Sequence, residues 1–113
     1  MAPENKAPVQ VNQGLEALKW VRNNLKPKKI CLSGESAGGY IATAVAMKDP
    51  NVDLLVPIMP MTSNMFLKRE DHQFNEFVRK YAHFMRKNYE LMVDDPKAHE
   101  DDPEIFPNLM SDD

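Results

Sequence analysis

Three of the four glycines in this 113-residue chain fall within six residues, namely Gly34, Gly38 and Gly39. They surround Ser36 in a Gly-x-Ser-x-Gly pattern. A short run with an apolar centre, residues 28–33, precedes the pattern and predicts a buried strand, whereas the alanine-rich residues 37–48 predict a tightly packed helix. A strand that turns directly into a helix holds its serine in a strained conformation with the hydroxyl exposed. We therefore expect a positive φ at Ser36, which is uncommon for a residue other than glycine.

The same pattern predicts chemistry at the serine. The chain passes so close to itself at such a turn that the positions two before and two after the serine need hydrogen side chains, which Gly34 and Gly38 supply. Unpaired N–H groups and the helix dipole favour a developing negative charge beside Ser36, and the N–H of Ala37 is placed to bind an oxyanion. The pattern therefore indicates a serine nucleophile. The alternative is a glycine-rich turn whose serine caps the helix without catalysis.

The residues around the pattern predict a parallel α/β architecture. Apolar side chains recur at helical spacing over residues 11–25, and a second apolar run at residues 53–58 predicts another buried strand. The order helix, strand, helix, strand is typical of parallel sheets, and we expect a right-handed crossover between the two strands. After Pro60 we expect a loop over residues 61–73 and a long amphipathic helix over residues 73–93 with Asp71 as its N-cap.

Composition excludes several classes of function. The net charge of −3 argues against nucleic acid as a partner, because phosphate binding needs a basic face. No apolar run is long enough for a membrane span, and the first residues do not resemble a signal peptide. The single cysteine, Cys31, is expected to be an inert buried thiol that forms no disulfide and builds no metal site. We therefore expect a soluble cytoplasmic protein with no cofactor and no metal.

The final residues, 94–113, carry eight acidic side chains, one lysine and three prolines, so we expect an irregular solvated tail. Three methionines near the start of the second half, Met59, Met61 and Met65, fit either the lining of an acyl pocket or flexible core filler, and core filler is the favoured interpretation.

The stretch Leu32-Ser33-Gly34-Glu35-Ser36-Ala37-Gly38-Gly39, with Ala2-Pro3-Glu4 and the helix over residues 14–21 upstream, resembles the hormone-sensitive-lipase-like branch of the α/β-hydrolases. This branch is the α/β-hydrolase fold-3 family and includes arylacetamide-deacetylase-like esterases. The resemblance runs from residue 2 to about residue 59, although Tyr40 stands where the family usually has Asn or a small residue.

The resemblance implies a partial α/β-hydrolase fold in which two parallel strands are flanked by helices and followed by a C-terminal cap-like helix. It divides one incomplete domain into a core fragment with a nucleophile elbow, residues 1–60, and a cap-like helix with an acidic loop, residues 61–113. It also implies hydrolysis of a small-molecule carboxylic ester, with Ser36 as nucleophile and Ala37 as one oxyanion donor. Glu35, the acidic neighbour customary in this branch, is expected to be structural.

The other catalytic groups of the resemblance are missing from the sequence. The family's His-Gly-Gly-type loop would lie before Ala2, and the acid and base normally follow the serine at the ends of later strands. The base candidates are His72, His83 and His99, and we expect none of them within hydrogen-bond reach of the Ser36 hydroxyl. His83 is expected at the surface or at the boundary of the core. A pairing of Asp94 or Asp95 with His99 has the right chain order, but these residues lie too close in the sequence to resemble the family geometry. We therefore expect a truncated gene product or a partial gene model.

Three interpretations remain open. The leading one is an ester hydrolase by descent that is inactive as an isolated chain. The second is a non-catalytic remnant that acts as a binding module, with self-association through its open strand edges. The third keeps the hydrolase chemistry but changes the substrate to a peptide or a thioester, which the serine pattern alone does not distinguish.

Overall fold

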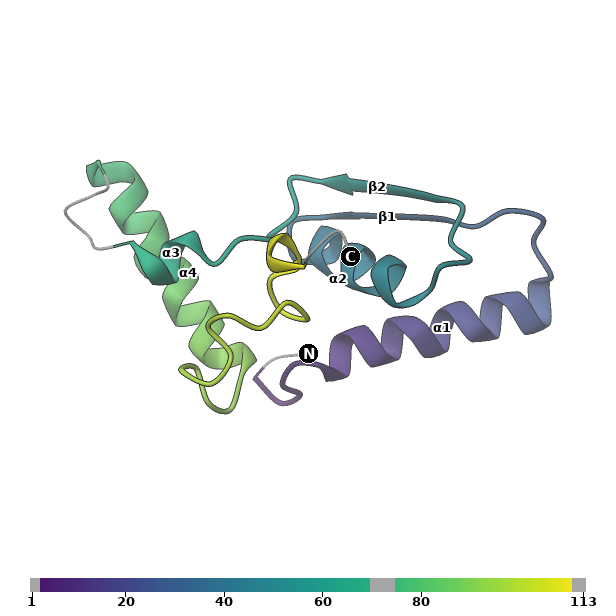
Figure 1. The fold of residues 1–113 in the computed structure, drawn as a ribbon, viewed down its shortest axis with the longest axis horizontal. Helices are drawn as coiled ribbons and strands as arrows, with labels where there is room; N and C mark the ends of the chain where they lie inside the picture. The colour runs from purple at the N-terminus through teal and green to yellow at the C-terminus, as the bar shows by residue number, and fades with distance from the viewer. Residues whose placement is uncertain (1–2, 70–74, 111–113) are drawn as a thin grey trace. The chain divides into compact units, whose positions relative to one another are not determined.

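The computed structural model describes residues 3–69 and 75–110 (Figure 1). Contacts within the chain divide these residues into two units, one formed by residues 8–62 and the other by residues 3–7 together with 63–110. Each unit has its own buried residues, so each is described by itself.

The unit over residues 8–62 is an α/β unit. Its elements follow the predicted order: α1 (Val9–Leu25), β1 (Cys31–Glu35), α2 (Ala37–Lys48) and β2 (Leu54–Ile58). The two strands pair in parallel, with Cys31 opposite Leu54 and Glu35 opposite Ile58. Within this unit α2 lies between the sheet and α1 (Figure 1). The predicted α/β class and the parallel pairing of the two strands are confirmed. The helices and strands could be predicted because the apolar spacing that specifies each of them is local in the sequence.

The core of this unit lies along α2. Its buried side chains are Val11 and Leu18 from α1, and Tyr40, Ala42, Ala44 and Val45 from α2. Gly14 lets α1 approach α2 closely, because a Cβ there would lie 2.6 Å from Cγ2 of Val45. An ion pair between Arg22 and Asp49 joins the last turns of the two helices, and the hydrogen bond from the guanidinium lowers the pKa of the Asp49 carboxyl.

The two strands are less buried than predicted. The register places Leu32 with Leu55 and Gly34 with Pro57 toward α2, so the alternate residues point to the opposite face. On that face Leu54, Val56 and Ile58 are exposed. Cys31 is also exposed, so the expectation of a buried thiol is wrong. Strand burial depends on what covers the second face of the sheet, and no described residue of this unit does so.

The second unit contains α3 (Met65–Lys68), α4 (Glu76–Met92) and the short 3₁₀ helix η2 (Pro107–Leu109). The long helix is confirmed, although it begins at residue 76 and not at 73. Its N-cap is Asn75, whose side-chain oxygen accepts the N–H of Val78 at 2.9 Å, while the predicted cap, Asp71, lies outside the described residues. The short helix α3 corrects the expectation of a loop over residues 61–73.

The acidic tail is not wholly solvated, which corrects a second expectation. Ile105 and Phe106 are buried and pack with Tyr89 and Val93 in one core cluster. The rings of Phe66, Tyr89 and Phe106 lie 5.5–6.4 Å apart between centroids. Asp101 and Glu104 are exposed beside this apolar pair, whereas Glu100 and Asp102 are half-buried. Two of these acidic residues hold α3, because the ammonium of Lys68 lies 2.8 Å from Asp101 and 3.4 Å from Glu100.

Tyr89 makes the stability of this unit depend on alkaline pH. Burial raises the pKa of Tyr89 to about 12, and its hydroxyl donates to the carbonyl of Pro96 at 2.8 Å. The folded state therefore holds the phenolic proton more tightly than the unfolded state, where a tyrosine titrates near about 10. This contribution is fully present below about pH 10 and is lost as the pH rises toward about 12.

The unfolding free energy of the wild type should fall between about pH 10 and about 12, and we expect this fall to be smaller in Tyr89→Phe. Urea titration at each pH measures the unfolding free energy of both proteins. Tyr81→Phe, which changes an exposed tyrosine on the same helix, is the matched control. An unchanged alkaline profile in Tyr89→Phe would contradict the assignment of the proton to this side chain.

Candidate functional site

Ser36 lies between the end of β1 and the start of α2, with φ 52° and ψ −115°. This positive φ confirms the angle predicted from the sequence. Ser36 occupies the N-cap position of α2, yet its side chain makes no capping hydrogen bond. The helix does not use the exposed hydroxyl, which argues against the alternative that Ser36 serves only as a cap.

The strained turn is held in place by the end of β2, the residues after it and the first turn of α2. The N–H of Ser36 donates to the carbonyl of Ile58 at 3.0 Å, and the carbonyl of Ser36 accepts from Tyr40 at 3.0 Å and from Met61 at 3.4 Å. Met59 also has a positive φ, 41°, and lies between the two residues of this segment that bond to Ser36. The hydrogen bonds of Ser36 with Ile58 and Met61 therefore join two turns that each hold a residue with positive φ, and they offset the strain.

Gly34 is required by close packing, as predicted. A Cβ at this position would lie 2.3 Å from the carbonyl oxygen of Gly38 and 2.4 Å from its carbonyl carbon. Gly38 itself has open space around its Cβ position, so the expectation that it too needs a hydrogen side chain is wrong. The second close approach is at Gly39, where a Cβ would lie 2.9 Å from the carbonyl oxygen of Gly34 and 3.1 Å from Pro60. The requirement at Gly39 was not predicted, although the Gly-Gly pair in the sequence is a signal that could have pointed to it.

The turn presents donors beside the hydroxyl. Ala37 is the first residue of α2 and is exposed, so its N–H is one of those that a helix cannot pair internally. The positive end of the helix dipole lies at the same place. An exposed hydroxyl next to such an amide can attack a carbonyl carbon and leave the resulting oxyanion beside a donor.

The predicted base candidates belong to the other unit or lie outside the described residues. His72 is outside them, and His83 is exposed on α4, as expected. His99 pairs through Nδ1 with Asp102 at 2.9 Å, and not with Asp94 or Asp95. The carboxylate three residues later is in reach because the chain turns there, with the N–H of Asp102 donating to the carbonyl of His99. The absence of a histidine at the Ser36 hydroxyl stays a prediction.

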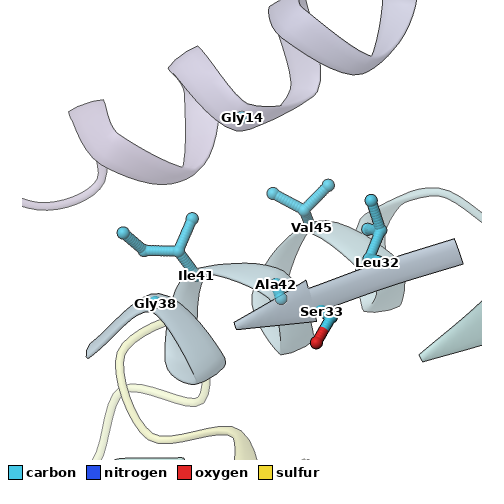
Figure 2. A pocket seen from close by; sticks show the side chains of 7 residues that line it. All are labelled: Gly14, Leu32, Ser33, Gly38, Ile41, Ala42 and Val45. Atoms are coloured by element: carbon cyan, nitrogen blue, oxygen red, sulfur yellow. The ribbon is translucent and has the colours of Figure 1, made fainter. Parts of the chain in front are cut away.

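A separate apolar pocket of about 220 Å³ adjoins the turn (Figure 2). Leu32, Ile41 and Val45 point from β1 and α2 toward Gly14 of α1, whereas the Ser33 hydroxyl points away from them and donates to the carbonyl of Val56 at 3.0 Å. Ser36 does not line this pocket.

The methionines are mostly not core filler, which corrects the favoured interpretation. Met59 is 78% exposed and Met65 is also exposed, while Met61 is half-buried. Glu35 is exposed at the end of β1. Among the residues that the structure describes, no three His, Cys, Asp or Glu side chains gather into a group that holds a metal ion.

Replacing Ser36 by glycine separates strain from chemistry. We expect Ser36→Gly to raise the unfolding free energy by about 1–2 kcal/mol, because glycine adopts a φ of 52° without the steric cost that serine carries. Ser33→Gly, in the neighbouring strand, is the matched control and should destabilise by about 0.5–1 kcal/mol. Urea unfolding measures both variants, and a destabilised Ser36→Gly would contradict the strain at this residue.

The helices that the structure describes include none with both the length and the apolar character needed to cross a bilayer. Comparison with protein families gives a match to the model of the family described as alpha/beta hydrolase fold, over residues 1–112.

Curated relatives match shorter parts of the chain. Arylacetamide deacetylase of Oryctolagus cuniculus is 38% identical over 64 residues, which is 48% of this chain and 16% of the relative. Arylacetamide deacetylase of Bos taurus is 33% identical over 103 residues, 82% of this chain and 25% of the relative. Arylacetamide deacetylase-like 2 of Homo sapiens is 34% identical over 58 residues, which is 45% of this chain and 14% of the relative. The matches thus span a quarter or less of each relative's length.

Proposed function

The chain belongs to the α/β-hydrolase fold-3 family, and from this premise we propose that it carries the nucleophile segment of a serine hydrolase of small-molecule carboxylic esters, with Ser36 as the nucleophile. The observation that supports this most is the backbone of Ser36, which has φ 52° and a hydroxyl that the following helix does not use. Strain of this kind concentrates where a side chain must be presented for reaction.

The proposed chemistry is acyl transfer. The Ser36 oxygen attacks the carbonyl carbon of the ester, and its proton passes to a base. The oxyanion of the tetrahedral intermediate accepts a hydrogen bond from the N–H of Ala37. The carbon–oxygen bond to the alcohol then breaks, the alcohol leaves with a proton, and water releases the acid from Ser36. Removal of an acetyl group from an arylacetamide, as the names of the relatives describe for those proteins, follows the same sequence except that a carbon–nitrogen bond breaks and an amine leaves with a proton.

The proposal assigns the base and its acid to no residue described here. His99 carries a carboxylate partner, but Asp102 follows it in the chain, whereas the acid precedes the histidine in the family's order. We therefore propose that these 113 residues alone turn over a short-chain aryl ester no faster than a Ser36→Ala control. A turnover that disappears in Ser36→Ala would overturn the inactivity and support the nucleophile.

A fluorophosphonate probe tests Ser36 without requiring turnover. The amide donor and the helix dipole accelerate attack of the Ser36 hydroxyl on the probe even without a base. We therefore expect one probe molecule to label each chain at Ser36. This labelling should be slow, but faster than labelling of the urea-denatured chain. Ser33→Ala, which removes an exposed serine hydroxyl three residues away, should label like the wild type, and Ser36→Ala should not label. Labelling no faster than in the denatured chain, or shared by several serines, would overturn the proposal.

A non-catalytic interaction module is the second candidate. The exposed sheet face formed by Leu54, Val56 and Ile58, together with two open strand edges, favours it, because uncovered apolar strands associate. Size-exclusion chromatography at rising concentration tests self-association. Val56→Lys should abolish the larger species, whereas Lys28→Gln, outside the strands, should leave them in place.

A cytoplasmic location also remains a proposal from composition.

A further inference from the structure

A stripe of exposed apolar side chains runs along α4. Phe77 is 81% exposed, Tyr81 is 57% exposed, Phe84 is 60% exposed and Leu91 is 49% exposed. Their spacing of four, three and seven residues puts them on one face of the helix. The neighbouring face, with Ala82, Met85 and Tyr89, is buried inside the unit, so the fold of this unit does not need the stripe. Large side chains left exposed in a row mark an interaction surface.

The charged residues nearest to the stripe are two lysines. Lys80 and Lys87 border it on one side, seven residues apart and therefore on the same flank. Each pairs with a glutamate farther round the helix, Lys80 with Glu76 at 3.3 Å and Lys87 with Glu90 at 3.2 Å. Both ion pairs are exposed and therefore weak, so a lipid phosphate competes readily with the glutamates for the lysine ammonium groups. Helix α4 has four cationic residues and two glutamates, a formal charge of +2 in a chain whose net charge is −3.

This arrangement disfavours a second copy of the chain as the occupant. In an antiparallel pair of α4 helices, the flank with Lys80 and Lys87 would face the same flank of the other copy, so lysines would oppose lysines. In a parallel pair the lysines would face the half-buried Val78 and Met85, which is buried in its own unit. Asn88 also interrupts the stripe, and its amide already donates to the carbonyl of Phe84 at 2.7 Å.

We propose that α4 lies flat in the headgroup region of an anionic lipid bilayer. The stripe enters the boundary between headgroups and acyl chains, and the two lysines contact lipid phosphates. A helix with aromatic side chains on one face and cationic side chains beside them has the chemistry of such a surface. The stripe belongs to one unit of the chain and Ser36 to the other.

Co-flotation of the whole chain with vesicles tests the proposal, because bound protein rises in a density gradient while aggregates sink. We expect flotation with vesicles of phosphatidylcholine and phosphatidylglycerol, little with phosphatidylcholine alone, and a loss as salt is raised. Phe77→Ser with Phe84→Ser should lower binding at least about tenfold, because two phenylalanine side chains no longer leave water. Ser36→Ala should float like the wild type, which separates this result from the proposed esterase chemistry.

Matched controls change exposed residues elsewhere. Trp20→Ser removes an exposed ring from α1, and Lys28→Gln with Lys29→Gln removes two charges outside α4. Both should bind like the wild type, whereas Lys80→Gln with Lys87→Gln should bind the anionic vesicles several-fold more weakly. Failure to float with either vesicle, or equal losses in the control variants, would overturn the proposal. So would a soluble dimer that Phe84→Ser dissociates, since a second copy would then occupy the stripe.

Discussion

Gly34→Ala is expected to unfold the unit over residues 8–62 or to cost it about 3–5 kcal/mol of unfolding free energy, a large part of the roughly 5–15 kcal/mol available to a domain. The added Cβ would lie 2.3 Å from the carbonyl oxygen of Gly38, which is backbone and belongs to the first turn of α2. Relief requires β1 and α2 to separate, and the hydrogen bonds at Ser36 would be lost with them.

Gly38→Ala is the matched control. The same Cβ added four residues later meets nothing within 4 Å, and alanine favours a helix over glycine by about 0.5–1 kcal/mol. We expect Gly38→Ala to leave stability unchanged or slightly raised. Urea unfolding monitored by amide hydrogen exchange at β1 and α2 measures both variants. Equal stability in the two would contradict the close approach of the strand to the helix.

The contrast between these glycines shows how far the sequence could predict the site. The strand, the turn and the helix around Ser36 follow from local patterns, and the positive φ follows from joining a strand directly to a helix. The motif also suggested that both outer glycines were required. The structure separates them, because the strand approaches the carbonyl of Gly38 and the backbone N of Gly39, and neither contact uses the Cβ position of Gly38.

Other features depend on residues distant in the sequence, and local patterns do not contain them. The bracing of Ser36 comes from Ile58 and Met61, more than 20 residues later, through a turn with a strained Met59. The exposure of β2 depends on which elements cover the sheet, whereas its apolar sequence alone predicted burial. In each case tertiary contacts override the local preference.

The acidic residues around Ile105 and Phe106 predicted a solvated tail, although both apolar side chains are buried. The variant Phe106→Ala tests how much the buried tail residues contribute to stability. Phe106 is 1% exposed and packs against the rings of Phe66 and Tyr89, with Ile105 beside it. We expect Phe106→Ala to destabilise the second unit by about 3–5 kcal/mol, because a buried ring is lost and a cavity remains. Phe77→Ala makes the same change at an exposed position of α4 and should stay within about 0.5 kcal/mol of the wild type. Hydrogen exchange at α4 amides reports on this unit alone. If the α4 amides of Phe106→Ala were as well protected from hydrogen exchange as those of Phe77→Ala, the tail would contribute little to the stability of the fold, as its acidic composition suggested.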